Sequence, residues 1–163
     1  MADRLYELAE RVIGALIARG WTAASAESCT GGQIGHALTE IPGSSAAYLG
    51  GVIAYANEIK IGQLGVPAAI IDAVGAVSPE TARAMAEGAR ERLGATVGLA
   101  TTGIAGPGGG SADKPVGLVY LSLALPGETL VERHIWAGGR SANKLQSVER
   151  ILAWLLERIE ERP

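Results

Sequence analysis

The sequence predicts an α/β protein, a three-layer αβα sandwich around a mixed sheet that contains a C-terminal antiparallel hairpin. Apolar strand-like runs alternate with amphipathic helical patterns along most of the chain, which is typical of helices packed on both faces of a sheet. Near the C-terminal end, two apolar runs flank Pro126-Gly127-Glu128, and so short a turn requires neighbouring antiparallel strands. A chain of 163 residues is expected to form a single domain over 1–163.

The individual elements are assigned from periodicity and from the residues that end them. Helices have apolar residues at three- and four-residue spacing and stop at glycine or proline, whereas buried strands are short apolar runs. Ser78 as N-cap with Pro79 at the first helical position marks one helix start. The expected elements are, in order, helix 3–19, strand 21–26, helix 33–41, strand 48–55, a short helix from 56 to 62 or 65, helix 67–74, helix 79–93, strand 96–102, strands 116–125 and 130–136, and helix 141–161.

Composition excludes several classes of function. The net charge of −3 and the absence of a basic run leave no electrostatic footprint for nucleic acid or for an anionic membrane surface. A single cysteine and two histidines offer no plausible metal constellation, so neither a metal nor another cofactor is expected. The first residues carry charges at helical spacing and do not resemble an export signal, so a cytoplasmic protein is expected.

The stretch Ala26-Glu27-Ser28-Cys29-Thr30-Gly31-Gly32 joins the first strand to a helix, which is where α/β enzymes present a nucleophile. Its paired glycines allow backbone N–H groups to approach a ligand closely. The first turn of the helix adds free donors and positive dipole charge, so an anion or an oxyanion is favoured there. Ser28 is therefore the candidate nucleophile. The alternative is that Ser28 or Thr30 only caps the helix.

Lys60 is the candidate base for Ser28. It lies between two isoleucines, and the nearest acid, Glu58, does not share its helix face. Partial burial would lower the pKa of Lys60 and make it a proton acceptor. Tyr55, at the end of the preceding strand, could hydrogen-bond to such a lysine and orient it. The alternatives are a surface lysine whose stem covers apolar neighbours and a tyrosine of the core.

A second glycine-rich loop, 103–110, follows the strand at 96–102. It lacks the glycine spacing of ATP-binding and dinucleotide-binding loops, but its backbone donors suit a phosphate or an amide. Thr102 adds a hydroxyl at the strand end, and Arg140 at the start of the last helix could fork onto a phosphate or carboxylate. The alternatives are a flexible surface loop and a surface arginine. The sequence places neither His36 nor His134 near these groups.

Five stretches together resemble the CinA C-terminal domain family, and they span nearly the whole chain in family order: 26–32, 41–45, 50–55 with Lys60, 75–78 and 102–109. Members of that family hydrolyse the carboxamide of nicotinamide mononucleotide to nicotinate mononucleotide and ammonia. The resemblance implies that Ser28 is the nucleophile and that Lys60 is its base. It also implies a small-molecule nucleotide substrate and a homodimer. A nucleotide-binding module of the same fold without turnover is the alternative.

The resemblance extends to further site residues. Tyr55 joins Ser28 and Lys60 as a catalytic residue. Family members usually have Gly-Asp-Arg before the last helix, whereas this chain has Gly138-Gly139-Arg140 and lacks the acidic residue. The expected substrate-binding residues are Thr30, Gly31, Gly32, Thr102, Gly103, Gly106 and Arg140.

Overall fold

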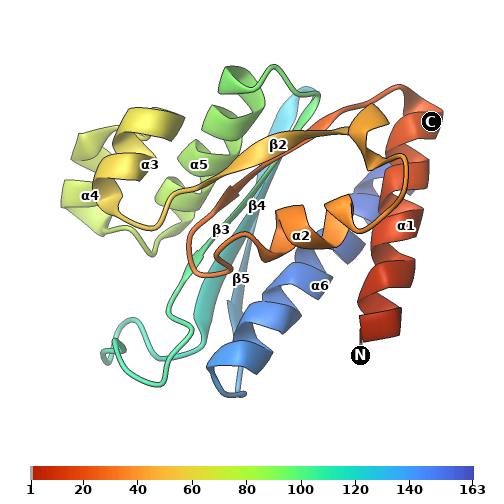
Figure 1. The fold of residues 1–163 in the computed structure, drawn as a ribbon. Coiled ribbons are helices and arrows are strands. Elements are labelled where there is room, and N and C mark those ends of the chain that lie inside the picture. Colours follow the sequence, from red (N-terminus) through yellow and green to blue (C-terminus); the bar gives the residue numbers. More distant parts are fainter. Residues whose placement is uncertain (1) are drawn as a thin grey trace.

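A computed structural model describes residues 2–163 and shows a five-stranded sheet between two layers of helices (Figure 1). Helices α1, α2 and α6 cover one face, and α3, α4 and α5 cover the other. The elements are α1 (Ala2–Arg19), β1 (Ala23–Glu27), α2 (Gln33–Thr39), the 3₁₀ turn η1 (Ser44–Ala46), β2 (Tyr48–Ile53), α3 (Asn57–Leu64), α4 (Ala68–Val74), α5 (Pro79–Arg92), β3 (Val97–Gly103), β4 (Leu118–Leu125), β5 (Glu128–Ile135) and α6 (Arg140–Glu160).

The sheet has the strand order β2-β1-β3-β4-β5. The pairs β1–β2 and β1–β3 are parallel, and the pairs β3–β4 and β4–β5 are antiparallel. The expected mixed sheet with a C-terminal hairpin is therefore confirmed. Because the three parallel strands end at the same edge, the loops that follow β1, β2 and β3 lie together, which is where ligand sites of α/β sheets form.

The two faces of the sheet are packed differently. Leucine and valine side chains from β3 and β4 fill the face that α1, α2 and α6 cover. The opposite face is lined mainly by alanines, and α5 lies very close to it. A Cβ on Gly98 of β3 would overlap the carbonyl oxygen of Ala86, and a Cβ on Gly88 of α5 would overlap that of Leu64. Glycines at these positions allow α5 to make backbone-to-backbone contact with β3 and with the end of α3.

Element boundaries differ from the expected ones by a few residues. The clearest difference is β2, which ends at Ile53 although the apolar run continues to Tyr55. The N–H of Ala54 still donates to the carbonyl oxygen of Glu27 in β1, but the carbonyl oxygens of Ala54 and Tyr55 accept hydrogen bonds from Lys60 Nζ instead of continuing the sheet ladder. The hairpin is also tighter than expected, because β4 reaches Leu125 and β5 begins at Glu128.

Candidate active site

Ser28 is the first residue after β1, at the edge where the parallel strands end. Its backbone N–H donates to the carbonyl oxygen of Thr101 in β3 at 3.0 Å, so its position is fixed by the neighbouring strand. It opens into a pocket of about 220 Å³. The pocket is lined by residues after β1 and β2, by the segment between α4 and α5, by the end of β3 and by the start of α6. These residues are Ser28, Cys29, Tyr55, Asn57, Lys60, Ala76, Val77, Thr102, Gly103, Ala105 and Arg140.

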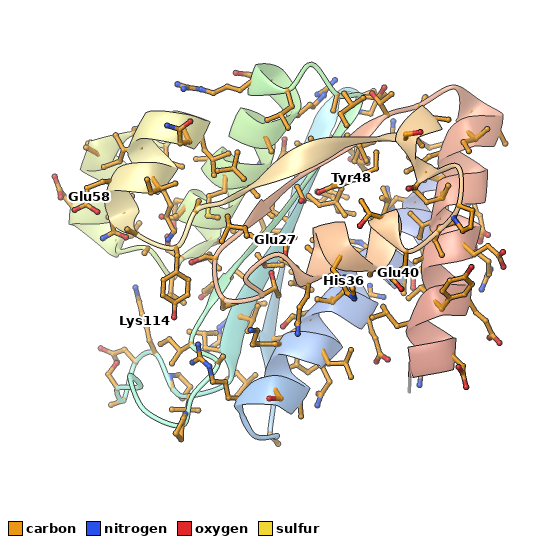
Figure 2. All side chains as sticks on the ribbon, in the orientation of Figure 1. Glu27, His36, Glu40, Tyr48, Glu58 and Lys114 are labelled. Carbon is orange, nitrogen blue, oxygen red and sulfur yellow. The ribbon has the colours of Figure 1, made fainter. Side chains whose placement is uncertain are left out.

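Lys60, on α3, is the buried amine of this pocket. Its side chain is 1% exposed, and Nζ lies 3.1 Å from Ser28 Oγ. Nζ also donates to the carbonyl oxygens of Ala54 at 2.8 Å and Tyr55 at 3.0 Å. Burial lowers the pKa of Lys60, because water no longer solvates the ammonium. Glu58 is exposed on the outer side of α3, so it does not hold Lys60 in the charged state (Figure 2).

Glu27 is buried on the other side of the same loop (Figure 2). Its Oε2 accepts from Thr30 Oγ1 at 2.7 Å and from the N–H groups of Gly32 and Ile34 at 3.0 Å each. Its Oε1 accepts from the N–H of Gly35 at 3.0 Å. The carboxylate therefore occupies the N-terminus of α2 and ties the loop that carries Ser28 to the first turn of that helix.

This arrangement corrects the expectation of an open anion site at the start of the second helix. The amide of Gly32 is bonded to Glu27, and the amide of Gly31 donates to the carbonyl oxygen of Ser28 at 3.2 Å. The hydroxyl of Thr30 is buried between Glu27 and Thr101. Binding of substrate by Thr30, Gly31 and Gly32 stays a prediction, but the amides of Gly31 and Gly32 and the hydroxyl of Thr30 already have partners inside the protein.

Tyr55 lies at the mouth of the pocket with its ring 64% exposed. The phenol oxygen accepts from Arg140 Nη2 at 3.4 Å, and the carbonyl oxygen contacts Lys60. Tyr55 therefore makes the expected hydrogen bond to Lys60, but through its main-chain carbonyl group and not through its ring. The ring borders the space in front of Ser28 instead.

Arg140 and the second glycine loop form the opposite wall. Arg140 Nη1 donates to the carbonyl oxygen of Gly106 at 2.9 Å, which brings two of the predicted binding residues together. Thr102 Oγ1 donates to the carbonyl oxygen of Ala76 at 2.8 Å, so this hydroxyl fixes the start of the α5 segment. Gly103 lines the pocket beside Thr102, whereas 107–113 lie exposed outside it.

Cys29 adjoins Ser28 but belongs to the core. Its side chain is 5% exposed and packs in the layer of α1, α2 and α6. Burial raises the pKa of Cys29 to about 11, so the thiol is protonated at neutral pH. Neighbouring residues of the loop thus face different environments, and the hydroxyl is the group beside Lys60.

The two histidines lie elsewhere. His36 is exposed on α2 (Figure 2), and His134 pairs with Glu132 at 2.8 Å on β5. Within residues 2–163, no three His, Cys, Asp or Glu side chains gather in a way that could hold a metal ion. The helices that the structure describes include none with the length and apolar character needed to cross a membrane.

The family model of the CinA C-terminal domain matches residues 5–159. The chain belongs to this family. A putative competence-damage inducible protein of Moorella thermoacetica is 51% identical over 144 residues, and one of Halothermothrix orenii is 53% identical over 145 residues. Both matches cover 88% of this chain but 35% of the relative, so the chain spans about a third of the length of these curated relatives.

Solved CinA structures share the fold over almost their whole length. The competence/damage inducible protein CihA of Agrobacterium tumefaciens superposes with a TM-score of 0.92 at 43% identity, covering 97% of this chain and 96% of that one. A CinA superfamily protein of Klebsiella pneumoniae gives 0.93 at 35% identity, covering 97% and 99%. The α/β sandwich of this chain is therefore the CinA fold.

Sequence reasoning missed two side chains of this CinA site. Glu27 lies within the stretch 26–32, but its position beside a serine does not predict that its carboxylate will occupy the N-terminus of a helix. Lys144 on α6 approaches the loop from the far side, with Nζ 3.7 Å from the position that a Cβ on Gly31 would take. The chain has few lysines, so the rarity of this residue type was the available signal.

Proposed function

We propose that this chain hydrolyses the carboxamide of nicotinamide mononucleotide to nicotinate mononucleotide and ammonia, with Ser28 as nucleophile and Lys60 as base. The observation that carries the proposal is the set of three oxygens around Lys60 Nζ. Two are carbonyl oxygens, which can only accept. A neutral amine that donates both protons to them has its lone pair left for the third oxygen, the hydroxyl of Ser28. Burial favours this neutral form.

The first half-reaction is acylation. Ser28 Oγ gives its proton to Lys60 Nζ and attacks the carboxamide carbon, which forms a C–O bond and places negative charge on the carboxamide oxygen. Collapse of this tetrahedral intermediate breaks the C–N bond. Lys60 returns the proton to the departing nitrogen, which leaves as ammonia, and Ser28 is left as an ester of the pyridine carboxylate.

The second half-reaction is deacylation. Water attacks the ester carbon while Lys60 takes one of its protons, and the proton passes to Ser28 Oγ as the C–O bond breaks. The product is released as the carboxylic acid, which loses its remaining proton to solvent and becomes the carboxylate. The free serine and the neutral lysine are restored. No metal or redox partner is required for either half.

The oxyanion of both steps requires donors near Ser28. Within residues 2–163, the N–H groups of Cys29 and Thr30 donate to no backbone carbonyl group. These two residues directly follow the nucleophile in the sequence. In α/β-hydrolases, the backbone N–H of the residue after the nucleophile is one of the donors that bind the oxyanion. We assign these two amides to the oxyanion, in place of the Gly31 and Gly32 amides, which have partners inside the protein.

The size of the pocket supports a substrate of which only the reacting end enters. At about 220 Å³ it is smaller than the ~300–1,000 Å³ of pockets that enclose a whole ligand. A pyridine carboxamide suits such a space, while ribose and phosphate would extend past the mouth toward Arg140. Guanidinium groups bind phosphate well, and this one has no carboxylate partner among the described residues.

We further propose that residues 1–163 act as one amidohydrolase domain of the CinA C-terminal type and that the domain works as a homodimer. The first proposal is supported by the family match over nearly the whole chain and by a sheet whose two faces are both covered. The second extends the family expectation to this chain.

Ammonia release tests the proposed reaction. Purified protein is incubated with nicotinamide mononucleotide, and ammonia and nicotinate mononucleotide are quantified together, with Ser28→Ala as the control. Equal amounts of both products, absent in the variant, would support the proposal. Binding of the nucleotide without ammonia would instead identify a nucleotide-binding module. Trapping with hydroxylamine should yield the hydroxamate of the pyridine acid if an acyl-enzyme forms.

A further inference from the structure

The outer edge of β2 is unusual among the surfaces of this molecule. Within residues 2–163, β2 pairs with β1 alone, so one side of the strand offers unpaired backbone groups. A bulge sets Leu49 off the ladder, and regular pairing with β1 resumes at Gly50. The N–H of Ala54 points to Glu27 of β1, so alternation directs the N–H and C=O groups of Gly51 and Ile53 to the open side.

This edge also lacks the charged side chains that often protect edge strands. Between Glu40 and Glu58 the chain has no charged residue. Leu49 is 46% exposed and Ile53 56% exposed, so the edge carries large apolar side chains in contact with water. Charged side chains on an edge strand usually prevent pairing with another chain. Their absence leaves β2 open to a further strand.

Beside the edge lies a groove of about 230 Å³ between β2 and α2. Its walls include the glycines of both elements, and a Cβ on Gly32 would lie 3.0 Å from Ile53 Cδ1. Side chains at these positions would take up space in the groove. An apolar side chain of a second molecule could enter it while the two strands pair. The residues that line the groove are Ser25, Glu27, Gly32, Gly35, His36, Thr39, Tyr48, Gly51, Val52 and Ile53.

We infer that the outer edge of β2, with the groove beside it, is where a second copy of this chain docks. The inference rests on the proposed homodimer and names its surface. A two-fold contact places a surface against itself, so charges near the axis would meet like charges, and an uncharged surface avoids this repulsion. Pairing β2 with β2 of the partner would continue the sheet, satisfy the open groups of Gly51 and Ile53, and cover Leu49 and Ile53.

Sedimentation velocity over a range of concentrations tests the surface. The wild-type protein should be a dimer, and Ile53→Lys and Leu49→Lys should each weaken it by at least about a hundredfold, because an ammonium would be buried in an apolar contact. The matched control is Ile135→Lys on β5, the opposite edge, where a similarly exposed isoleucine (52%) should be replaceable without effect on the dimer. Circular dichroism checks that each variant is folded.

Two outcomes would overturn the inference, and they differ. A wild-type protein that is monomeric at every concentration would remove the homodimer itself. A dimer that survives both β2 substitutions, or that only Ile135→Lys dissociates, would move the interface elsewhere and leave the dimer intact. If a lysine variant does not fold, hydrogen exchange on the wild type decides, since the amides of Gly51 and Ile53 should exchange more slowly as protein concentration rises. The ammonia assay is independent of all these results.

Discussion

Glu27 and Lys60 are both buried beside the loop that carries Ser28, and they are satisfied in opposite ways. The carboxylate of Glu27 accepts from three backbone amides and a hydroxyl, so its charge is fully surrounded by donors. The amine of Lys60 faces two carbonyl oxygens and one hydroxyl, with no carboxylate. A buried ionisable group whose partners are all fixed hydrogen-bond donors of the protein has a structural role, as Glu27 does. A buried group that contacts a hydroxyl able to give up its proton, as Lys60 does, is available for proton transfer.

Replacing Lys60 should have the largest effect. Lys60→Arg retains positive charge but cannot release its proton at working pH, so it should lose about as much activity as Lys60→Ala, on the order of a thousandfold or more. Nucleotide binding should survive in both, as measured by calorimetry. An arginine variant that keeps most of its turnover would reduce Lys60 to an electrostatic or packing role.

Replacing Glu27 should mainly affect stability. Glu27→Gln turns an amide NH₂ toward backbone donors, and loss of charged hydrogen bonds in a buried site should lower the free energy of unfolding by roughly 2–4 kcal/mol in urea titrations. The matched control is Glu40→Gln at the exposed end of α2, for which no measurable change is expected. If the two glutamine variants unfold alike, the carboxylate does not hold the loop.

The pH dependence separates the two residues further. Because the pKa of Lys60 is lowered, kcat/KM should rise with pH through one ionisation below the ~10.4 of a free lysine. The unfolded chain keeps that proton to higher pH, so the free energy of unfolding should also rise between the folded and unfolded pKa values. Lys60→Met should lack this rise and should be the more stable protein below the window. A flat activity profile up to pH 10 would contradict the assignment.

The smallest effects are expected at Cys29 and on chelation. Cys29→Ala should leave kcat within about threefold, because the thiol has a pKa of about 11 and faces the core. A loss as large as that of Ser28→Ala would transfer the nucleophile to the thiol.

Dialysis against EDTA should likewise leave turnover unchanged, since the proposed steps use only Ser28, Lys60 and backbone amides. Loss of activity that zinc or magnesium restores would contradict the mechanism.

The order and type of the elements were predictable because the apolar spacing along this chain matches the faces that are buried. The meeting of Ser28 and Lys60 rested on the resemblance to the CinA family, since no periodicity places α3 against the end of β1. Contacts made by backbone atoms could not be predicted at all. The carbonyl oxygens of Ala54 and Tyr55 have no residue-type signature, so the sequence could not show that Tyr55 contacts Lys60 through its main chain.

The glycine contacts of α5 have a consequence for how this protein tolerates mutation. Carbonyl groups of Leu64 and Ala86 rest against Gly88 and Gly98, so the spacing from α3 through α5 to β3 is set by main-chain atoms. Ser28 is fixed to the same strand through Thr101. Substitutions among the apolar side chains of α5 during evolution should therefore leave the distance between Lys60 Nζ and Ser28 Oγ nearly unchanged. A single methyl group added at Gly88 or Gly98 would instead displace α5 from its neighbours.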